Sequence, residues 1–364
     1  MERKKKILGS LFWILLISIS AHSQENFTVK QLSKVYQQRE AKASANLKAV
    51  LAEQRKFIAD KKLSFFVANT SVSEKKLESI TGALPVNEHE VEHLNAMLKT
   101  KVLSPDLLGI LKKYRIPSCG PSSKAYDSRT FNLVPAIRYQ RCGNCWAYSA
   151  TGALECSFIK VNHITPPTSI DLSEKQIVSC SGAGTCGGGW PYKVFDWLKT
   201  SQTKVISEAS DPDDGTDHPC PPPPYSSSVQ LADWGIVDPS QGLFKIAAID
   251  KIKEAICTYG SVSVCLLATP LFGNYAGGVF YEQASNNNSP SINHAVVLVG
   301  WDDAKQAWLL RNSWGTNWGI SGYCWISYNT NNIGYGAIWC IAKQRPSKII
   351  YTVPKTTEVK KVNN

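Results

Sequence analysis

The stretch Cys142-Gly143-Asn144-Cys145-Trp146-Ala147-Tyr148-Ser149 decides how this 364-residue sequence is interpreted. Its Gly-Asn pair favours a turn, and residues 144–160 continue with small and apolar side chains at helical spacing. Cys145 therefore lies at the beginning of a predicted helix, where the positive end of the helix dipole favours a thiolate. Because the thiolate is the reactive form of cysteine, Cys145 is a candidate nucleophile.

A thiolate that transfers acyl groups needs a neighbouring acid, usually histidine, to protonate the leaving amine. Of the six histidines, only His294 lies at the start of an apolar strand, residues 295–299. Asn312 follows the next predicted strand, 308–311, and mirrors His294 about residue 303. A hairpin centred there would make the two residues cross-strand partners about 5 Å apart.

Taken alone, either residue is better explained as structural, His294 as a buried histidine and Asn312 as the end of a strand. Their combination with Cys145 favours a catalytic arrangement instead. In that arrangement the Asn312 amide would accept a hydrogen bond from the imidazole and orient the ring.

Several blocks of the chain, in family order, resemble the papain-like cysteine peptidases. The resemblance covers roughly residues 119–345 and rests on the blocks 142–149, 172–180, 186–191, 260–264, 294–301 and 311–319. It implies an α+β, papain-like two-lobed fold with a helical left lobe, a β-barrel-like right lobe and an active-site cleft between them. It also implies a cysteine endopeptidase that works through an acyl-enzyme thioester and is made as a secreted zymogen.

The resemblance assigns roles residue by residue. Cys145 corresponds to the nucleophile, His294 to the general acid/base and Asn312 to its orienting partner. Gln140 corresponds to the glutamine that forms the oxyanion hole with the backbone N–H of Cys145. The substrate-binding residues implied by the family are Gly188, Gly189, Trp190, Pro191, Cys265, Ala295 and Trp314.

Three features depart from the family pattern. Gln140 lies five residues before Cys145, where the family usually has six. Asn144 replaces the usual small residue before the nucleophile. The segment 24–118 lacks a clean copy of the helix motif common in family pro-segments, although residues 65–70 and 80–82 resemble its end.

Composition divides the chain into four parts. Residues 1–23 resemble a secretory signal peptide, with a basic start, an apolar run and small residues before Gln24. A membrane anchor is the alternative, but the apolar run is too short to span a bilayer. Residues 24–118 are cysteine-free and mostly helical, and are expected to be an inhibitory propeptide rather than a permanently attached helical domain. The peptidase domain is 119–345, and 346–364 form a polar tail.

The secondary-structure pattern changes along the predicted peptidase domain. Ser173 is expected to cap a helix, with Gln176 three residues later. A further helix is expected at 249–259, and strands dominate after residue 293. The Pro-, Ser- and Asp-rich stretch 207–240 predicts one long surface loop.

Eleven cysteines in an exported chain indicate disulfides, and the odd number leaves at least one thiol unpaired. The family pattern implies the pairs Cys142–Cys186 and Cys180–Cys220. It also aligns Cys340 loosely with the floor of the specificity pocket, within reach of Cys324 or Cys265. The sequence assigns no partners to the remaining cysteines, Cys119, Cys156 and Cys257.

Charge and composition exclude several other classes. The net charge of +11 resides almost entirely in residues 1–118, which carry +9, so no basic cluster for nucleic acid marks the remainder. No metal or cofactor is expected, because Cys142 and Cys145 lack a second ligand pair at zinc spacing. The expected partners are protein or peptide substrates and the chain's own propeptide, with the enzyme a secreted or periplasmic monomer that is not inserted in a membrane.

Two rival interpretations remain open. Cys142 and Cys145 could form a C-x-x-C redox motif, although no βαβ pattern surrounds them. Alternatively, the shortened step from Gln140 to Cys145 could belong to a catalytically impaired, peptidase-like binding protein.

Overall fold

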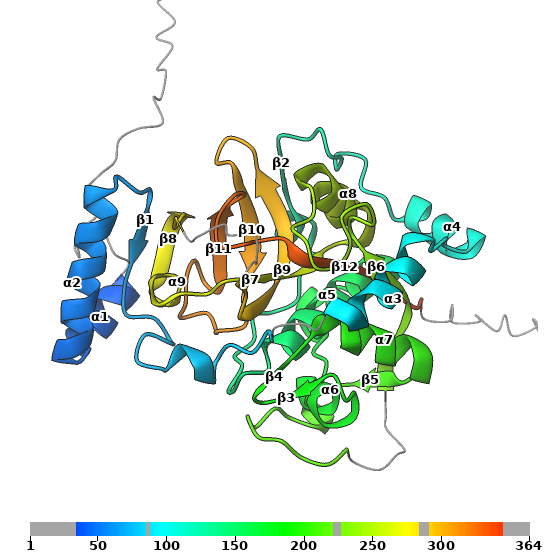
Figure 1. The fold of residues 1–364 in the computed structure, drawn as a ribbon, viewed down its shortest axis with the longest axis horizontal. Helices are drawn as coiled ribbons and strands as arrows, with labels where there is room; N and C mark the ends of the chain where they lie inside the picture. The colour runs from blue at the N-terminus through cyan, green and yellow to red at the C-terminus, as the bar shows by residue number, and fades with distance from the viewer. Residues whose placement is uncertain (1–33, 85–87, 221–226, 284–290, 345–364) are drawn as a thin grey trace, which may run out of the picture.

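The computed structural model describes residues 34–84, 88–220, 227–283 and 291–344 (Figure 1). The predicted signal peptide, residues 1–23, and the predicted tail, 346–364, lie outside the described residues. So does the run of four prolines at 221–224.

A ten-stranded sheet forms the framework of the molecule. Its strand order is β1-β8-β11-β10-β9-β7-β12-β6-β5, with β2 also paired to β9. The strands are β1 (Phe65–Val67), β2 (Ala125–Asp127), β5 (Lys204–Ile206), β6 (Ser227–Ile236), β7 (Val262–Leu266), β8 (Tyr275–Phe280), β9 (His294–Asp302), β10 (Ala307–Arg311), β11 (Tyr323–Ser327) and β12 (Tyr335–Ala342). Among the described strands the order is open, so the lobe that was expected to be barrel-like is a sheet rather than a closed barrel.

Three helices of the first lobe pack beside this sheet: α5 (Cys145–Asn162), α6 (Glu174–Cys180) and α7 (Pro191–Ser201). Helix α5 is buried along almost its whole length, and small side chains let it approach β9 and β12 closely. Gly152 leaves room for the guanidinium of Arg311, which lies 4.0 Å from the Glu155 carboxylate. Helix α5 is therefore held in place by packing and by this buried ion pair.

Two large hydrophobic cores correspond to the two predicted lobes. One surrounds α5 and α7 and includes Trp146, Phe195 and Trp234. The other lies on the sheet with α8 (Ile249–Tyr259) and includes Trp308 and Trp318. This arrangement of helical and sheet-based cores confirms the predicted α+β, two-lobed organisation.

The basic N-terminal segment lies along the outside of the fold formed by residues 119–344 (Figure 1). It contains α1 (Lys34–Ala41), α2 (Ala45–Asp60), strand β1, the 3-10 turn η2 (Leu77–Ser79), α3 (Glu88–Lys99) and α4 (Pro105–Lys113). Ser44 caps α2 by accepting a hydrogen bond from the backbone N–H of Leu47 at 3.2 Å. Strand β1 joins the edge of the sheet by pairing with β8, so the segment is part of the folded molecule.

Three local structure predictions are confirmed. The helix expected from residue 144 is α5, and α8 covers the predicted range 249–259. The side chain of Ser173 accepts a hydrogen bond from the backbone N–H of Gln176, as expected of a helix cap.

The prediction of one long loop over 207–240 is wrong in its second half, because residues 227–236 form strand β6 between β12 and β5. Val229 and Leu231 are fully buried there. The prolines and serines that precede this strand concealed its apolar alternation.

The predicted register of the β9–β10 hairpin is also wrong. Trp301 pairs with Trp308 and Val297 pairs with Arg311, and the register shifts between Leu309 and Leu310. Both pairings differ from a hairpin centred on residue 303. The chain turns over residues 303–306, so the hairpin is centred between residues 304 and 305 where the strands begin to pair, and the irregularity then adds one residue to β9.

The disulfides match the family pattern where it implied pairs. Cys142–Cys186 and Cys180–Cys220 are both formed. A third bridge, Cys119–Cys257, joins the first cysteine of the chain to α8. Cys340 is a buried free thiol, as are Cys265 and Cys324, so the pairing suggested for Cys340 is wrong.

None of the helices in the described ranges is both long and apolar enough to cross a membrane.

Candidate active site

Cys145 begins helix α5 and is a fully buried free thiol. Cys142 is bonded to Cys186, so the two cysteines of the C-x-x-C sequence do not form a redox pair with each other. The bridge and the hydrogen bond from the Gly143 N–H to the Cys186 carbonyl, 2.9 Å long, hold the turn that leads into the helix.

His294 and Asn312 are in direct contact, although they are not opposite each other in the hairpin. The imidazole Nε2 lies 2.8 Å from Oδ1 of Asn312, and both side chains are buried. Because an amide oxygen only accepts hydrogen bonds, Nε2 carries the proton in the neutral ring. The other ring nitrogen, Nδ1, is then an unprotonated base, and it has no hydrogen-bond partner among the described residues.

Trp314 covers this pair. Its ring stacks on the imidazole with centroids 4.5 Å apart and planes at 25°. The indole is fully buried against Phe272 and Trp318. This packing keeps water from competing with Asn312 for the imidazole N–H.

Gln140 is also buried, and Ser313 holds it at two points. The backbone N–H of Gln140 donates to the Ser313 carbonyl at 2.8 Å, and the Ser313 hydroxyl donates to Oε1 of Gln140 at 2.5 Å. Since Oε1 is occupied, the side-chain NH₂ group points away from Ser313. It donates to the carbonyls of Ile80 at 3.0 Å and Cys142 at 2.8 Å.

The N-terminal segment passes directly over the thiol at residues 80–84. The carbonyl of Ile80 takes hydrogen bonds from Gln140 and from the Trp314 indole, and the carbonyl of Gly82 accepts from the Gly189 N–H at 2.8 Å. The Cys145 sulfur accepts hydrogen bonds from the backbone N–H groups of Ala295 and Trp146 and, within the segment, of Gly82 and Ala83.

The N–H of Ala83 that contacts the sulfur also donates to the Asn293 carbonyl at 2.8 Å. Ala83 also forms an isolated parallel β-bridge with Gly189.

Burial controls the charge of both reactive groups in this form. It raises the pKa of the Cys145 thiol to about 11, although backbone N–H groups of Ala295, Gly82 and neighbouring residues act in the opposite direction. It lowers the pKa of His294 to about 4, partly offset by the hydrogen bond to Asn312. With the N-terminal segment in place, a neutral thiol and a neutral imidazole are therefore favoured near pH 7.

The residues expected to bind substrate lie on both sides of residues 80–84. Gly188 and Gly189 form β4 and contact Gly82. On the sheet, Ala295 pairs with Cys265, and Trp190 and Cys265 both approach Gly336. Pro191 is the first residue of α7 and lies next to this group in the chain.

Sequence reasoning missed three residues around these positions. Ser313 anchors Gln140 and could have been suspected from its place between Asn312 and Trp314. Phe244 and Tyr335 pack around Trp190, with ring centroids 5.2 and 6.4 Å away. No pattern in the sequence connects these two aromatic residues to Trp190, because only the fold brings them together.

Comparison with known families and curated proteins identifies what this arrangement resembles. A model described as papain family cysteine protease matches residues 122–343. Digestive cysteine proteinase 3 of Homarus americanus is 36% identical over 222 residues, which cover 58% of this chain and 64% of that protein. Digestive cysteine proteinase 1 of the same organism is 30% identical over 288 residues, covering 74% of this chain and 84% of that protein. The match to the first of these relatives thus spans less than two thirds of its length.

Solved structures extend the similarity in fold beyond the family domain. Digestive procathepsin L 3 of the Tenebrio molitor larval midgut has a TM-score of 0.61 at 24% identity, covering 85% of this chain and 93% of that one. The recombinant stem bromelain precursor has the same TM-score at 20% identity, covering 86% and 95%. At these identities the likeness shows the fold alone, including part of the N-terminal segment.

Proposed function

Because this chain belongs to the papain family of cysteine proteases, we propose that it is a cysteine endopeptidase that hydrolyses peptide bonds of protein substrates. The observation that carries the proposal is the hydrogen bond of 2.8 Å between His294 and Asn312 beside a buried, free Cys145 at the start of α5. The intact set of side chains disfavours the alternative of an impaired binding protein.

The proposed reaction begins with a proton transfer from the Cys145 thiol to Nδ1 of His294. The thiolate attacks the carbonyl carbon of the scissile bond, and the negative charge moves to the carbonyl oxygen, where Gln140 Nε2 and the Cys145 N–H donate hydrogen bonds. When the C–N bond breaks, the imidazolium returns its proton to the leaving amine. Water then attacks the thioester with His294 as the base, which releases the acid product and restores the thiol.

We also propose that residues 24–118 are a propeptide that inhibits this site. The supporting contacts are those of residues 80–84, which occupy the Gln140 donor and the Gly189 N–H that a substrate would need. Gly82 is essential to so close a passage, because a Cβ atom there would lie 1.9 Å from the Gly143 carbonyl oxygen.

The substrate-binding residues and the N-terminal 23 residues also have proposed roles. Gly188 and Gly189 would pair with substrate backbone, and Trp190, Pro191, Cys265 and Ala295 would line the pocket for the second residue before the scissile bond, while Trp314 shields the catalytic pair. Residues 1–23 would direct the precursor to a secreted or periplasmic location, where the enzyme acts as a monomer.

Self-processing of the purified full-length precursor tests the catalytic assignment. Wild type at reduced pH should lose its N-terminal third and then cleave a peptide substrate in a reaction blocked by an epoxide thiol inhibitor. Cys145→Ala and His294→Ala should do neither, whereas Gln140→Ala should retain a rate about 10²–10³-fold lower because one oxyanion donor is lost. Equal processing of wild type and Cys145→Ala would contradict the proposal, as would a processed wild type that turns over no peptide.

A further inference from the structure

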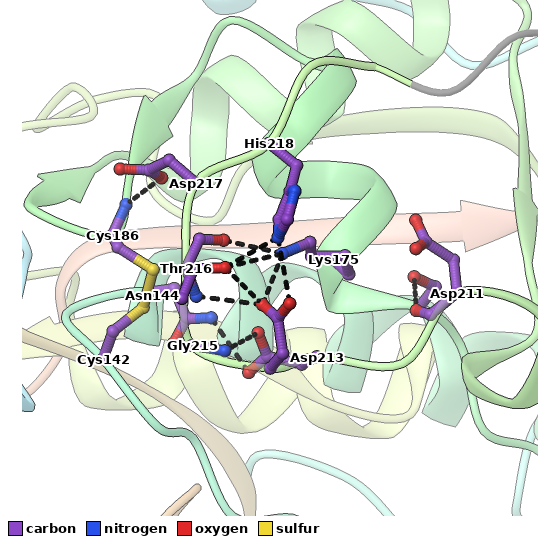
Figure 2. A network of polar contacts seen from close by, with 12 residues as sticks. Cys142, Asn144, Lys175, Cys186, Asp211, Asp213, Gly215, Thr216, Asp217 and His218 are labelled. Atoms are coloured by element: carbon purple, nitrogen blue, oxygen red, sulfur yellow. Dashed lines mark hydrogen bonds and ion pairs between the residues drawn. A yellow bond between two sulfur atoms is a disulfide. The ribbon is translucent and has the colours of Figure 1, made fainter.

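The residue before the nucleophile is held by a carboxylate from a distant loop. Asn144 is fully buried, and its Nδ2 donates to Oδ2 of Asp213 at 3.2 Å. Figure 2 shows this contact between the turn at Cys142 and the loop that carries Asp213. In place of the small residue usual in the family, the chain has one that can reach across to this loop.

The same carboxylate fixes the first turn of α5 at a second point. The hydroxyl of Tyr148 donates to Oδ2 of Asp213 at 2.8 Å, one turn beyond Asn144. The other oxygen, Oδ1, accepts from the Gly215 N–H at 3.1 Å. Asp213 is itself buried, so its position is set by these donors and by its own N–H bond to Glu208.

The loop segment 213–217 touches the shortened step between Gln140 and Cys145 as well. Gly215 has a φ of +77°, and a Cβ atom there would lie 2.6 Å from Cβ of Arg141. Asp217 accepts a hydrogen bond from the Cys186 N–H at 2.7 Å, and Cys186 is bonded to Cys142. The segment therefore contacts the turn through Arg141, through the disulfide and through Asn144.

Lys175 and His218 make a separate set of contacts with the loop. Lys175 of α6 donates to Oδ1 of Asp214 at 2.5 Å and to the Thr216 carbonyl at 2.7 Å, and His218 lies 2.9 Å from Asp214. In Figure 2 the Lys175 side chain points into this part of the loop. Of the acidic residues in this loop, Asp214 is thus the one paired with the Lys175 ammonium.

We propose that Asp213 is a positioning residue for Cys145, acting through Asn144 and Tyr148, and that segment 213–217 braces the shortened turn on which the oxyanion hole is built. The inference rests on the proposed peptidase function. Its physical basis is that a displacement of about 1 Å in a catalytic group costs roughly 10²-fold in rate. The step from Gln140 to Cys145 is one residue shorter than the family pattern, so contacts from segment 213–217 help to hold the turn in place.

The test uses Asp213→Ala and the milder Tyr148→Phe in the full-length precursor, converted by a trace of tagged wild-type enzyme that is then removed. Asp213→Ala should lower kcat about 10-fold to 10²-fold with KM within about 2-fold, and should slow alkylation of Cys145 by iodoacetamide across the pH range. Tyr148→Phe should give a smaller change of the same kind.

Asp211→Asn is the matched control, because it removes one negative charge from the same loop and Asp211 lies apart from Asn144 in Figure 2. A double-mutant cycle with Asn144→Ala should show that the two losses are not additive, since both break one contact. Unchanged kcat and alkylation in folded Asp213→Ala and Tyr148→Phe, or an equal loss in Asp211→Asn, would overturn the inference. An inactive, processed wild type would instead refute the peptidase function.

Discussion

At the scale of single residues, burial keeps the proposed catalytic pair, Cys145 and His294, uncharged in this structure. The Nε2–H group of His294 donates a hydrogen bond to Asn312, and the Trp314 ring stacks on the imidazole. Cys145 lies beneath the backbone of residues 82–83. A thiolate–imidazolium pair is expected of the mature enzyme, so removal of the N-terminal segment must restore solvent or substrate dipoles that stabilise these charges.

Docking of the N-terminal segment is expected to depend on pH. Burial lowers the pKa of His294 to about 4 in the docked form, so docking is favoured while the undocked ring would also be neutral, and it weakens as the pH falls below the pKa of the undocked ring toward 4. In a Cys145→Ser precursor, which cannot process itself, NMR should show the His294 ring neutral until the pH approaches 4. After the segment is removed in trans, the same ring should titrate at higher pH.

The His294 signal can be assigned by its loss in His294→Gln. A ring that titrates near pH 6.5 in the intact precursor would show that the segment does not bury the imidazole as described. A pKa that stays unchanged after removal of the segment would contradict the proposed link between docking and charge.

At the scale of elements, the N-terminal segment docks by two kinds of backbone pairing. Strand β1 joins the sheet edge antiparallel to β8, and Ala83 bridges to β4 in parallel. Between them the segment is fixed by Ser71, whose hydroxyl donates to the Trp314 carbonyl at 2.5 Å. Side chains of the segment add to these backbone contacts, since Phe65, Val72 and Ile80 are buried in the hydrophobic core of the sheet.

Gly82 gives the sharpest prediction at this scale. A Cβ at position 82 would lie 1.9 Å from the Gly143 oxygen and 3.0 Å from Cα of Gly188, both backbone atoms that cannot rotate away. Gly82→Ala should therefore loosen the segment, and the variant precursor should react with an epoxide inhibitor at neutral pH at least about 10-fold faster than wild type, as a loss of about 1.4 kcal/mol implies.

Gly109→Ala in helix α4 is the matched control. A Cβ there meets no atom within 4 Å, and Gly to Ala in a helix interior should stabilise by about 0.5–1 kcal/mol. If both variants protect Cys145 as wild type does, residues 80–84 are not the inhibitory contact.

At the scale of the whole molecule, the Cys119–Cys257 bridge connects parts of the chain 138 residues apart. It attaches the beginning of the predicted mature chain to α8, which packs against strands β7, β9 and β12 of the sheet. If the propeptide is removed before Cys119, this bridge keeps the new N-terminus fixed to the catalytic region.

Removing this bridge should therefore destabilise the protein markedly. Cys119→Ala with Cys257→Ala should cost about 2–5 kcal/mol, measured by denaturant unfolding of the precursor, because long closed loops restrict the unfolded chain most. Removal of the Cys180–Cys220 bridge, which closes a separation of only 40 residues, should cost less. An unchanged unfolding midpoint without Cys119 and Cys257 would contradict the prediction.

The sequence by itself determined the parts of this protein that depend on local pattern. The start of α5 at Cys145, the capping of α6 by Ser173 and the helix α8 follow from turn residues, caps and apolar spacing, which act within a few residues. The family blocks implied the pairing of Cys142 with Cys186 and brought His294 and Asn312 together as candidates.

Tertiary structure alone decided how these pieces meet. The turn of the β9–β10 hairpin lies at residues 303–306, which leaves Asn312 out of alignment with His294, yet the chain after β10 brings its amide to the imidazole. The strand β6, the bridge to Cys257 and the contact of Asp213 with Asn144 all join segments far apart in the chain. Such contacts depend on packing in three dimensions, and the local periodicity of a single sequence does not predict them.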